Sequence, residues 1–245
     1  MVTLPRSVLV AVDFGGASAT AVAVGGAIAE RCQPSALRLL HAESMDAPAY
    51  FTSDQIGRLE RERHELLAQA DEFLARFGRQ HTPTGFSTRV VLLPPVDAIL
   101  RESEASDLVV MGTHGRHGPS RWWLGSVAER VLREIARPLL IVRAGGTGSA
   151  PSIFERALIP SAPAPGTDGA LEFGRELTRC LGGAVLDRRQ ESIEVAVEET
   201  RATMAIVALP DARTPSWLSN VGEPLVRSCS VPILFIPAIA QGAWS

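Results

Sequence analysis

A set of spaced glycines in the middle of the chain has the pattern of an anion-binding loop. Gly112 and Gly115 follow the apolar run 107–111, and Gly125 and Ser126 open a helical pattern after nine further residues. Glycines let the main chain come close to a phosphate, and the first N–H groups of a helix have no acceptor within the helix. Ser126 adds a hydroxyl that can cap the helix or bond a phosphate oxygen. The spacing therefore predicts a nucleotide phosphate site at a helix N-terminus.

The elements that must position this loop alternate along the first 143 residues. Continuous apolar runs such as 8–12 are typical of buried parallel strands. Alternating strands and helices predict a parallel, doubly wound α/β domain. We expect strands over 8–12, 37–42, 86–93, 108–111 and 139–142, and helices over 17–31, 53–80, 96–103 and 126–136. The helix over 53–80 should turn one apolar stripe to the core, made of Leu59, Leu66, Leu67, Ala70, Phe73, Leu74 and Phe77.

The same pattern begins again after the small-residue linker 144–152. Here we expect strands over 156–160, 184–186, 205–209 and 232–236, and helices over 168–181, 193–201 and 221–229. This second copy lacks counterparts of the helix over 53–80 and of the strand over 86–93. The sequence thus predicts two domains, residues 1–145 and a shortened copy at residues 152–238.

Composition and cysteine usage limit the class of protein. The 245 residues are 46% hydrophobic and 21% charged, as in globular proteins, and the net charge of −3 argues against a general binder of nucleic acid or anionic membranes. No apolar run approaches the roughly 18 residues that a membrane helix needs, and residues 7–12 are interpreted as a strand rather than a signal peptide. Cys32, Cys180 and Cys229 are odd in number and far apart, which predicts reduced thiols in a cytoplasmic protein.

Five segments together resemble the universal stress protein family, in particular its tandem two-domain members. They are 8–14, 39–42, 107–116, 124–132 and 137–143, and they contain the family's Gly-x2-Gly-x9-Gly-Ser/Thr motif. The resemblance implies two Rossmann-like (adenine nucleotide alpha hydrolase-like) domains, with strand order 3-2-1-4-5 in the first. The strand absent from the second copy would be an edge strand, so its loss leaves the others contiguous. It also implies ATP, ADP or AMP, with Mg²⁺, over the carboxyl ends of strands 1 and 4.

The resemblance implies a role for each matching position. Ala11 and Ala42 would line the adenine, and Asp13 would accept from the adenine amine or the ribose, although it can also cap the following helix. Phosphates would lie on the glycines and on the backbone of the helix start, where His114 can instead be a hinge and Arg116 a solvated charge. His41 is interpreted as a structural histidine. The complete predicted set is Ala11, Val12, Asp13, Ala42, Met111, Gly112, His114, Gly115, Arg116, Gly125, Ser126, Val127 and Ala128.

The second copy departs from the motif, and it is therefore predicted not to bind nucleotide. Ser161 replaces Asp13, Ala208 and Asp211 replace the first two glycines, and 219–220 reads Ser-Asn. The resemblance also implies that the fifth strands, 139–142 and 233–236, pair inside one chain as a pseudo-dimer. A further homodimer and an unidentified regulated protein remain open as partners.

The favoured function is an ATP-binding stress-response regulator or sensor with at most slow hydrolysis. The sequence offers no convincing general base or nucleophile beside the phosphates, and it contains no lysine for a P-loop. Two alternatives remain: an interaction module with an empty site, and an adenine-nucleotide-dependent hydrolase such as an ATP pyrophosphatase. The Ser-Gly-Gly-x-Asp-Ser loop of that last class is only partly matched by residues 15–18.

Overall fold

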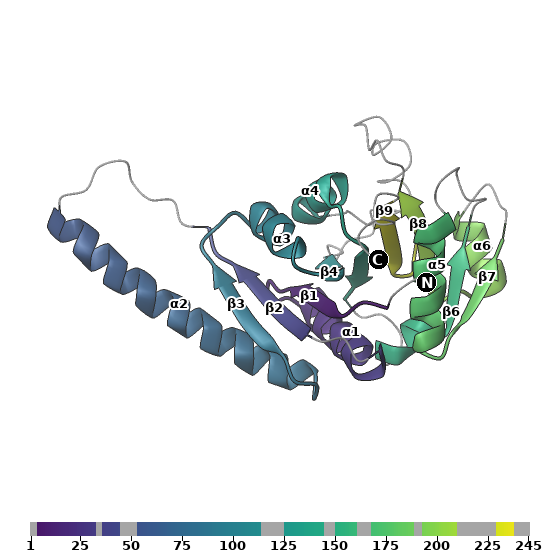
Figure 1. Ribbon diagram of the computed structural model, residues 1–245, viewed down its shortest axis with the longest axis horizontal. Coiled ribbons are helices and arrows are strands. Elements are labelled where there is room, and N and C mark those ends of the chain that lie inside the picture. The colour runs from purple at the N-terminus through teal and green to yellow at the C-terminus, as the bar shows by residue number, and fades with distance from the viewer. Residues whose placement is uncertain are drawn as a thin grey trace, which may run out of the picture.

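The computed structural model places the strands of both halves of the chain in one sheet (Figure 1). It describes residues 4–32, 36–44, 53–113, 125–144, 150–160, 168–188, 193–209 and 229–237. The strands are β1 (Ser7–Ala11), β2 (Ala36–Ala42), β3 (Ser87–Val91), β4 (Leu108–Thr113), β5 (Leu139–Arg143), β6 (Arg156–Ile159), β7 (Ala184–Asp187), β8 (Met204–Leu209) and β9 (Ile233–Pro237). The helices are α1 (Gly16–Cys32), α2 (Ser53–His81), α3 (Pro95–Ser103), α4 (Ser126–Glu134), α5 (Asp168–Cys180) and α6 (Ile193–Thr200), with a 3-10 turn at Ala150–Phe154. These bounds confirm the predicted elements to within a few residues, while the helix expected over 221–229 lies almost wholly outside the described residues.

The sheet joins the two halves edge to edge. Its strand order is β3-β2-β1-β4-β5-β9-β8-β6-β7, so the predicted order 3-2-1-4-5 of the first half is confirmed. In the second half the order of the described strands matches a copy that has lost its third strand. Neighbouring strands are parallel except β5 and β9, which pair antiparallel with Leu140 opposite Leu234. The predicted pairing of the fifth strands inside one chain is therefore confirmed.

Helices cover both faces of this sheet. Successive side chains of a strand point to opposite faces, so Val8 and Val10 of β1 pack with α1, α2 and α5, and Leu9 packs in the core under α3, α4 and α6. Both cores continue across the β5–β9 pair, because Leu140 and Leu234 lie in one and Leu139 and Phe235 in the other. The two halves thus share their hydrophobic core.

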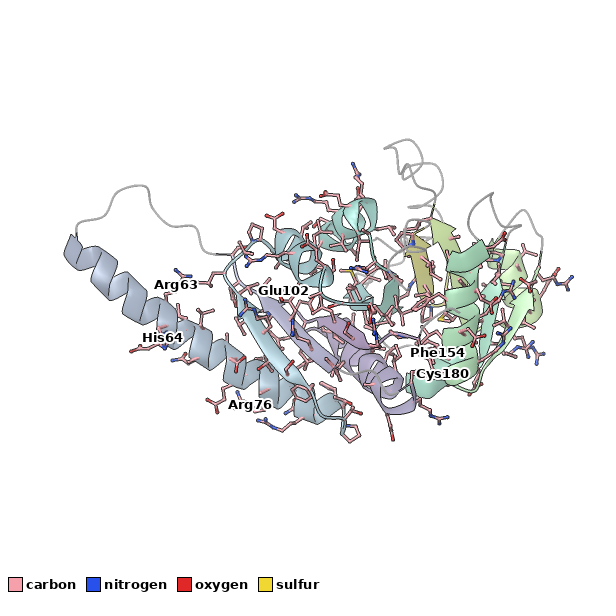
Figure 2. All side chains as sticks on the ribbon, in the orientation of Figure 1. Arg63, His64, Arg76, Glu102, Phe154 and Cys180 are labelled. Carbon is pink, nitrogen blue, oxygen red and sulfur yellow. A yellow bond between two sulfur atoms is a disulfide. The ribbon has the colours of Figure 1, made fainter. Side chains whose placement is uncertain are left out.

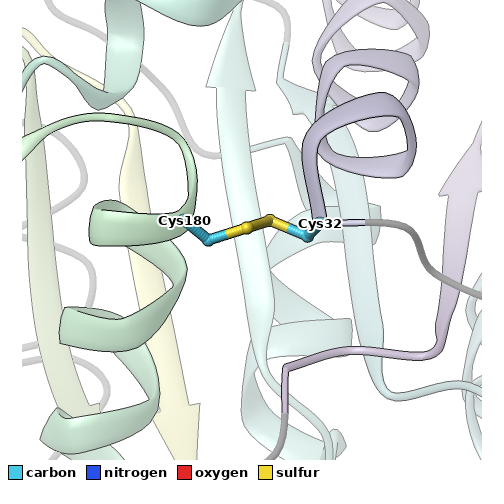
Figure 3. The surroundings of a disulfide bond; sticks show 2 residues. All are labelled: Cys32 and Cys180. Atoms are coloured by element: carbon cyan, nitrogen blue, oxygen red, sulfur yellow. A yellow bond between two sulfur atoms is a disulfide. The ribbon is translucent and has the colours of Figure 1, made fainter.

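A disulfide bond links the two halves on the face covered by α1 and α5. It joins Cys32 at the end of α1 to Cys180 at the end of α5, with the two Cα atoms 5.9 Å apart (Figure 3). The prediction of reduced thiols is wrong for these two residues. Their separation of 148 positions gave no sign that α1 and α5 would lie side by side. Cys229 is buried and takes no part in a disulfide, so the prediction of a reduced thiol holds for it.

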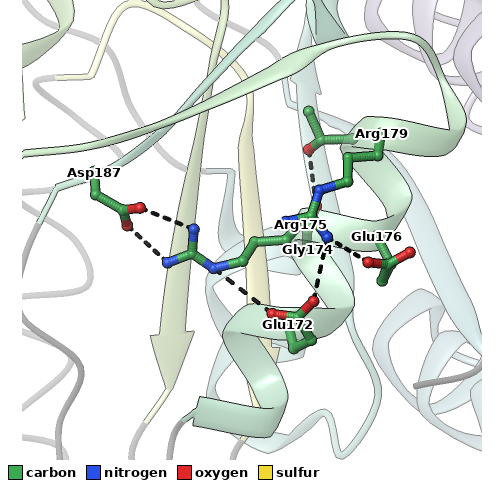
Figure 4. Close-up of polar contacts among 7 residues, drawn as sticks. Glu172, Gly174, Arg175, Glu176, Arg179 and Asp187 are labelled. Carbon is green, nitrogen blue, oxygen red and sulfur yellow. Dashed lines mark hydrogen bonds and ion pairs between the residues drawn. The ribbon is translucent and has the colours of Figure 1, made fainter. Parts of the chain in front are cut away.

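An ion pair ties α5 to the end of β7 (Figure 4). The guanidinium of Arg175 donates to both carboxylate oxygens of Asp187, at 2.8 and 2.7 Å, and Glu172 lies 3.9 Å from the same guanidinium. The hydrogen bonds from Arg175 lower the pKa of Asp187, and its positive charge acts in the same direction. The Asp187 side chain is 59% exposed, so solvent screens most of this interaction.

We expect Asp187→Asn to lower the free energy of unfolding at pH 7 by less than about 1 kcal/mol. Because the folded pKa is depressed, the contribution of Asp187 is present above the unfolded pKa of about 4 and is lost as the pH falls below it. Urea unfolding of both proteins at pH 7 and at successively lower pH measures the difference. A difference that does not shrink in acid would contradict this account.

Candidate functional site

A cavity of about 230 Å³ opens at the carboxyl ends of β1, β2 and β4, on the face that α3 and α4 cover. Every predicted site residue within the described ranges lines it. His114, Gly115 and Arg116 lie outside the described residues. The lining residues are Ala11, Val12, Asp13, Ser18, Leu40, His41, Ala42, Pro95, Ile99, Met111, Gly112, Thr113, Gly125, Ser126, Val127 and Ala128.

One part of the cavity is apolar and narrow. Ala11 and Ala42 end β1 and β2, and Met111 lies opposite Ala11 near the end of β4, so the three share one edge of the sheet. Ile99 of α3 and Val127 of α4 close the cavity from the helix layer. The small Ala11 and Ala42 and the branched Ile99 and Val127 give this part of the cavity an apolar surface on which a flat ring can pack.

The N-terminus of α4 forms a polar part of the same cavity. The first hydrogen bond of the helix runs from the N–H of Glu129 to the carbonyl of Gly125, at 2.9 Å. The N–H groups of Ser126, Val127 and Ala128 precede that bond, so they have no acceptor in the helix. With the helix dipole they make this end of the cavity attractive to an anion.

Gly112 and Gly125 of the motif differ in how much space a side chain would have at each position. A Cβ on Gly125 would meet no atom of the described residues within 4 Å. A Cβ on Gly112 would lie 2.5 Å from the carbonyl carbon of Ala17. Gly112 therefore lets the end of β4 approach α1, a packing reason that glycine spacing alone did not reveal.

Asp13 lines the cavity and stabilises the turn that precedes α1. Its Oδ1 accepts a hydrogen bond from the N–H of Gly15 at 3.0 Å and another from the hydroxyl of Ser18. Ser18 in turn accepts from the N–H of Asp13 at 3.0 Å. The first hydrogen bond of α1 runs from the N–H of Ala19 to the carbonyl of Gly15, so these contacts lie in the turn before the helix, and a capping role for Asp13 stays a prediction. Sequence reasoning missed Ser18, although a hydroxyl in the first turn after Asp13 was a visible sign.

His41 is held by protein groups. Its Nδ1 lies 2.8 Å from the carbonyl oxygen of Val12 and its Nε2 lies 3.0 Å from Oε1 of Glu43. The Phe14 ring packs on the imidazole, with the ring centroids 4.4 Å apart. The interpretation of His41 as a structural histidine is confirmed.

Comparison with protein families decides what kind of domain carries this cavity. The sequence model of the Universal stress protein family matches residues 5–143. The chain belongs to this family. A universal stress protein of Mycolicibacterium smegmatis is 32% identical over 96 residues, 39% of this chain and 30% of that protein. One of Methanocaldococcus jannaschii is 27% identical over 85 residues, 33% of this chain and 52% of that protein. The chain therefore matches about a third to a half of the length of these relatives.

Solved universal stress proteins share the fold over nearly the whole chain. A structure from Archaeoglobus fulgidus has a TM-score of 0.67 at 17% identity and covers 95% of this chain and 98% of its own. A structure from Pseudomonas aeruginosa has a TM-score of 0.60 at 13% identity, covering 97% and 96%. At such identities the likeness concerns the fold alone, and it extends beyond residue 143 into the second half.

In this universal stress protein α3 is fixed over the cavity by ion pairs to the sheet. Glu102 of α3 lies 3.6 Å from the guanidinium of Arg38 on β2 and 3.5 Å from that of Arg89 on β3 (Figure 2). The Glu102 side chain is nearly buried while both arginines are half exposed. These contacts hold Pro95 and Ile99 against the strand ends.

The counterpart of the site in the second half falls mostly outside the described residues. Ser161, Asp211, Ser219 and Asn220 all lie there. Ala208 is described and lies on β8, at the position that corresponds to Gly112. That this half does not bind nucleotide stays a prediction. Among the residues that the structure describes, no group of three or more His, Cys, Asp or Glu side chains is placed to hold a metal ion.

Proposed function

We propose that the cavity of the first half binds one adenine nucleotide, ATP, ADP or AMP, with Mg²⁺. The proposal rests on one observation: an apolar surface and the N-terminus of α4 line the same cavity. A nucleotide has the matching parts, a flat base and an anionic phosphate chain.

The lining residues suggest the orientation of the ligand. The base would lie on Ala11, Ala42 and Met111, and Asp13 would accept from the base or the ribose. The phosphates would then extend along the backbone N–H groups of residues 126–128. At 230 Å³ the cavity is smaller than typical ligand pockets of about 300–1,000 Å³, so the phosphates would lie at its open end.

We further propose that this universal stress protein acts as a stress-response regulator or sensor rather than as an efficient enzyme. We assign no catalytic role to any residue, and hydrolysis would be slow at most. The division into domains at residues 1–145 and 152–238, and the role of the β5–β9 pair as an intramolecular pseudo-dimer, belong to the same proposal.

A cytoplasmic location is likewise proposed. No helix within the described ranges is both long and apolar enough to cross a membrane. The disulfide between Cys32 and Cys180 argues against a cytoplasmic location, because cytosolic thiols are usually kept reduced.

Mass spectrometry and absorbance of the nucleotide released from freshly purified protein test the proposed site. We expect ATP or ADP in equimolar amount with the chain. Protein that is free of nucleotide and does not bind ATP–Mg²⁺ at millimolar concentration would overturn the proposal and favour an interaction module.

A further inference from the structure

The turn between β1 and α1 holds a bulky residue in an unusual backbone conformation. Phe14 has a φ of 62°, in the left-handed region that glycine adopts freely and that residues with a large side chain rarely enter. In the described part of the chain, Arg201 is the other non-glycine residue with a positive φ, and it directly follows α6, where this conformation commonly ends a helix. Phe14 instead follows Asp13 of the cavity. Backbone strain of this kind is often found at functional sites.

The conformation of Phe14 fixes the carboxylate of Asp13. Oδ1 of Asp13 accepts a hydrogen bond from the N–H of Gly15 at 3.0 Å, which closes a short turn around Phe14. If residue 14 left the left-handed region, the N–H of Gly15 would point elsewhere and the carboxylate would lose this bond. The position of Asp13 in the cavity therefore depends on the backbone angles of its neighbour.

The ring of Phe14 stabilises a conformation that would otherwise suit glycine. Its centroid lies 4.4 Å from that of His41, and it packs edge-on against Phe73 and Phe77 of α2, with centroids 4.6 and 5.5 Å apart. Aromatic contacts of this kind are favourable beyond the area that they bury. They hold the ring between β2 and α2 and thereby offset the strain of the backbone.

Through these contacts α2 reaches the nucleotide cavity from outside. Asp13 and His41 line the cavity, whereas Phe14 and Phe73 line a separate groove of about 580 Å³ beside α2. Phe73 is 43% exposed, and the guanidinium of Arg76 lies 5.1 Å from the centroid of its ring. A change at Phe73 therefore acts on the cavity by way of the Phe14 ring.

We propose that Phe14 is a positioning residue through which α2 controls the nucleotide affinity of the cavity. Contacts with α2 keep residue 14 in the left-handed conformation, and this conformation holds Asp13 where it meets the base or the ribose. This control rests on the proposed nucleotide site and places part of its regulation outside the cavity.

Two substitutions of Phe14 separate positioning from packing. Phe14→Ala and Phe14→Gly both remove the ring, but only glycine adopts a φ of 62° without strain. We expect Phe14→Ala to weaken ATP–Mg²⁺ binding at least about tenfold in isothermal titration calorimetry. Phe14→Gly should bind at least about fivefold more tightly than Phe14→Ala. A side chain that only filled space would give both variants the same affinity.

The variant Phe73→Ala tests the control by α2. Because Phe73 is partly exposed, we expect its truncation to leave the chain folded and to weaken ATP–Mg²⁺ binding at least about threefold. Leu66→Ala is the matched control and should bind as the wild type does. Leu66 lies on the same helix, lines the same groove and is 56% exposed, but it precedes Phe73 by about two helical turns.

The amide of Gly15 reports the position of Asp13 in the absence of nucleotide. In hydrogen-exchange NMR, Phe14→Ala should raise the exchange rate of this amide toward the rate in Asp13→Ala, whereas Phe14→Gly should leave it near the wild-type rate. A wild-type chain that binds no nucleotide would refute the proposed function and the control of affinity. The exchange rate of Gly15 would still decide whether Phe14 positions Asp13.

Equal ATP affinities of Phe14→Ala and Phe14→Gly would overturn the proposal. An exchange rate of Gly15 that Phe14→Ala leaves unchanged would do the same, because Asp13 would then be held without the ring. Control by α2 would be refuted by a Phe73→Ala protein that binds ATP as tightly as Leu66→Ala does.

Discussion

Replacing Gly125 with valine is expected to abolish nucleotide binding while the chain stays folded. The backbone of Gly125 has φ −60° and ψ 149°, an extended conformation that valine adopts readily, and a side chain there meets no described atom within 4 Å. The new methyl groups would stand at the start of α4, where the free N–H groups receive the phosphates. We expect ATP–Mg²⁺ affinity to fall at least about 100-fold, equivalent to about 2.7 kcal/mol, in isothermal titration calorimetry.

Gly112→Ala is the contrasting variant from the same motif. Its Cβ would collide with the main chain of Ala17, so we expect the free energy of unfolding to fall by about 1–3 kcal/mol. Ala208→Ser, at the corresponding position of the second half, should change neither affinity nor fold. Asp13→Ala is a less clean test, because it also removes the hydrogen bonds that Asp13 accepts from Gly15 and Ser18 in the turn before α1. A Gly125→Val protein that binds ATP as tightly as the wild type would refute the proposed phosphate site.

Loss of the disulfide is expected to cause the largest change in stability. Cys32 and Cys180 are separated by 148 positions, and closing a loop of that size restricts the unfolded chain by about 5 kcal/mol in the chain-entropy model. The double variant Cys32→Ser/Cys180→Ser should therefore unfold at a much lower urea concentration than the oxidised wild type. Because the two halves also share their core, we expect the variant to remain folded in the absence of urea.

Reductant provides the control for this comparison. Dithiothreitol should lower the unfolding midpoint of the wild type and leave that of the double variant unchanged. The buried Cys229 is present in both proteins, so it cancels in the comparison. A wild-type midpoint that does not respond to reductant would mean that Cys32 and Cys180 are thiols in solution.

Most of the architecture could be predicted because the signals are local. The helix expected over 53–80 is observed as Ser53–His81, and the apolar run 8–12 forms β1 at Ser7–Ala11. Asp13 comes just after β1, Gly112 lies near the end of β4 and Gly125 precedes α4, and the carboxyl ends of parallel strands share one edge. Their convergence on one cavity therefore follows from the order of the elements.

The parts of the site that sequence missed come from ordinary core positions. Leu40, Pro95 and Ile99 line the cavity, yet nothing in their residue type or spacing distinguishes them from other apolar residues. They contribute because α3 begins beside the cavity at Pro95, while Glu102 near its other end pairs with Arg38 of β2 and Arg89 of β3. Such contacts depend on the distances between helices and strands, and these distances cannot be predicted from the residue types of a single sequence.

The resemblance to the family implied the pairing of β5 with β9, whereas the sequence by itself determined the alternation of strands and helices and the motif of the cavity. These depend on periodicity and on residue types within short segments. Only the tertiary structure decided that Cys32 meets Cys180, that Gly112 is needed for packing on Ala17, and that Leu66 and Phe73 remain exposed. The reason is that each of these outcomes depends on where one element ends relative to another in space, and α2 simply extends farther than the sheet it packs on.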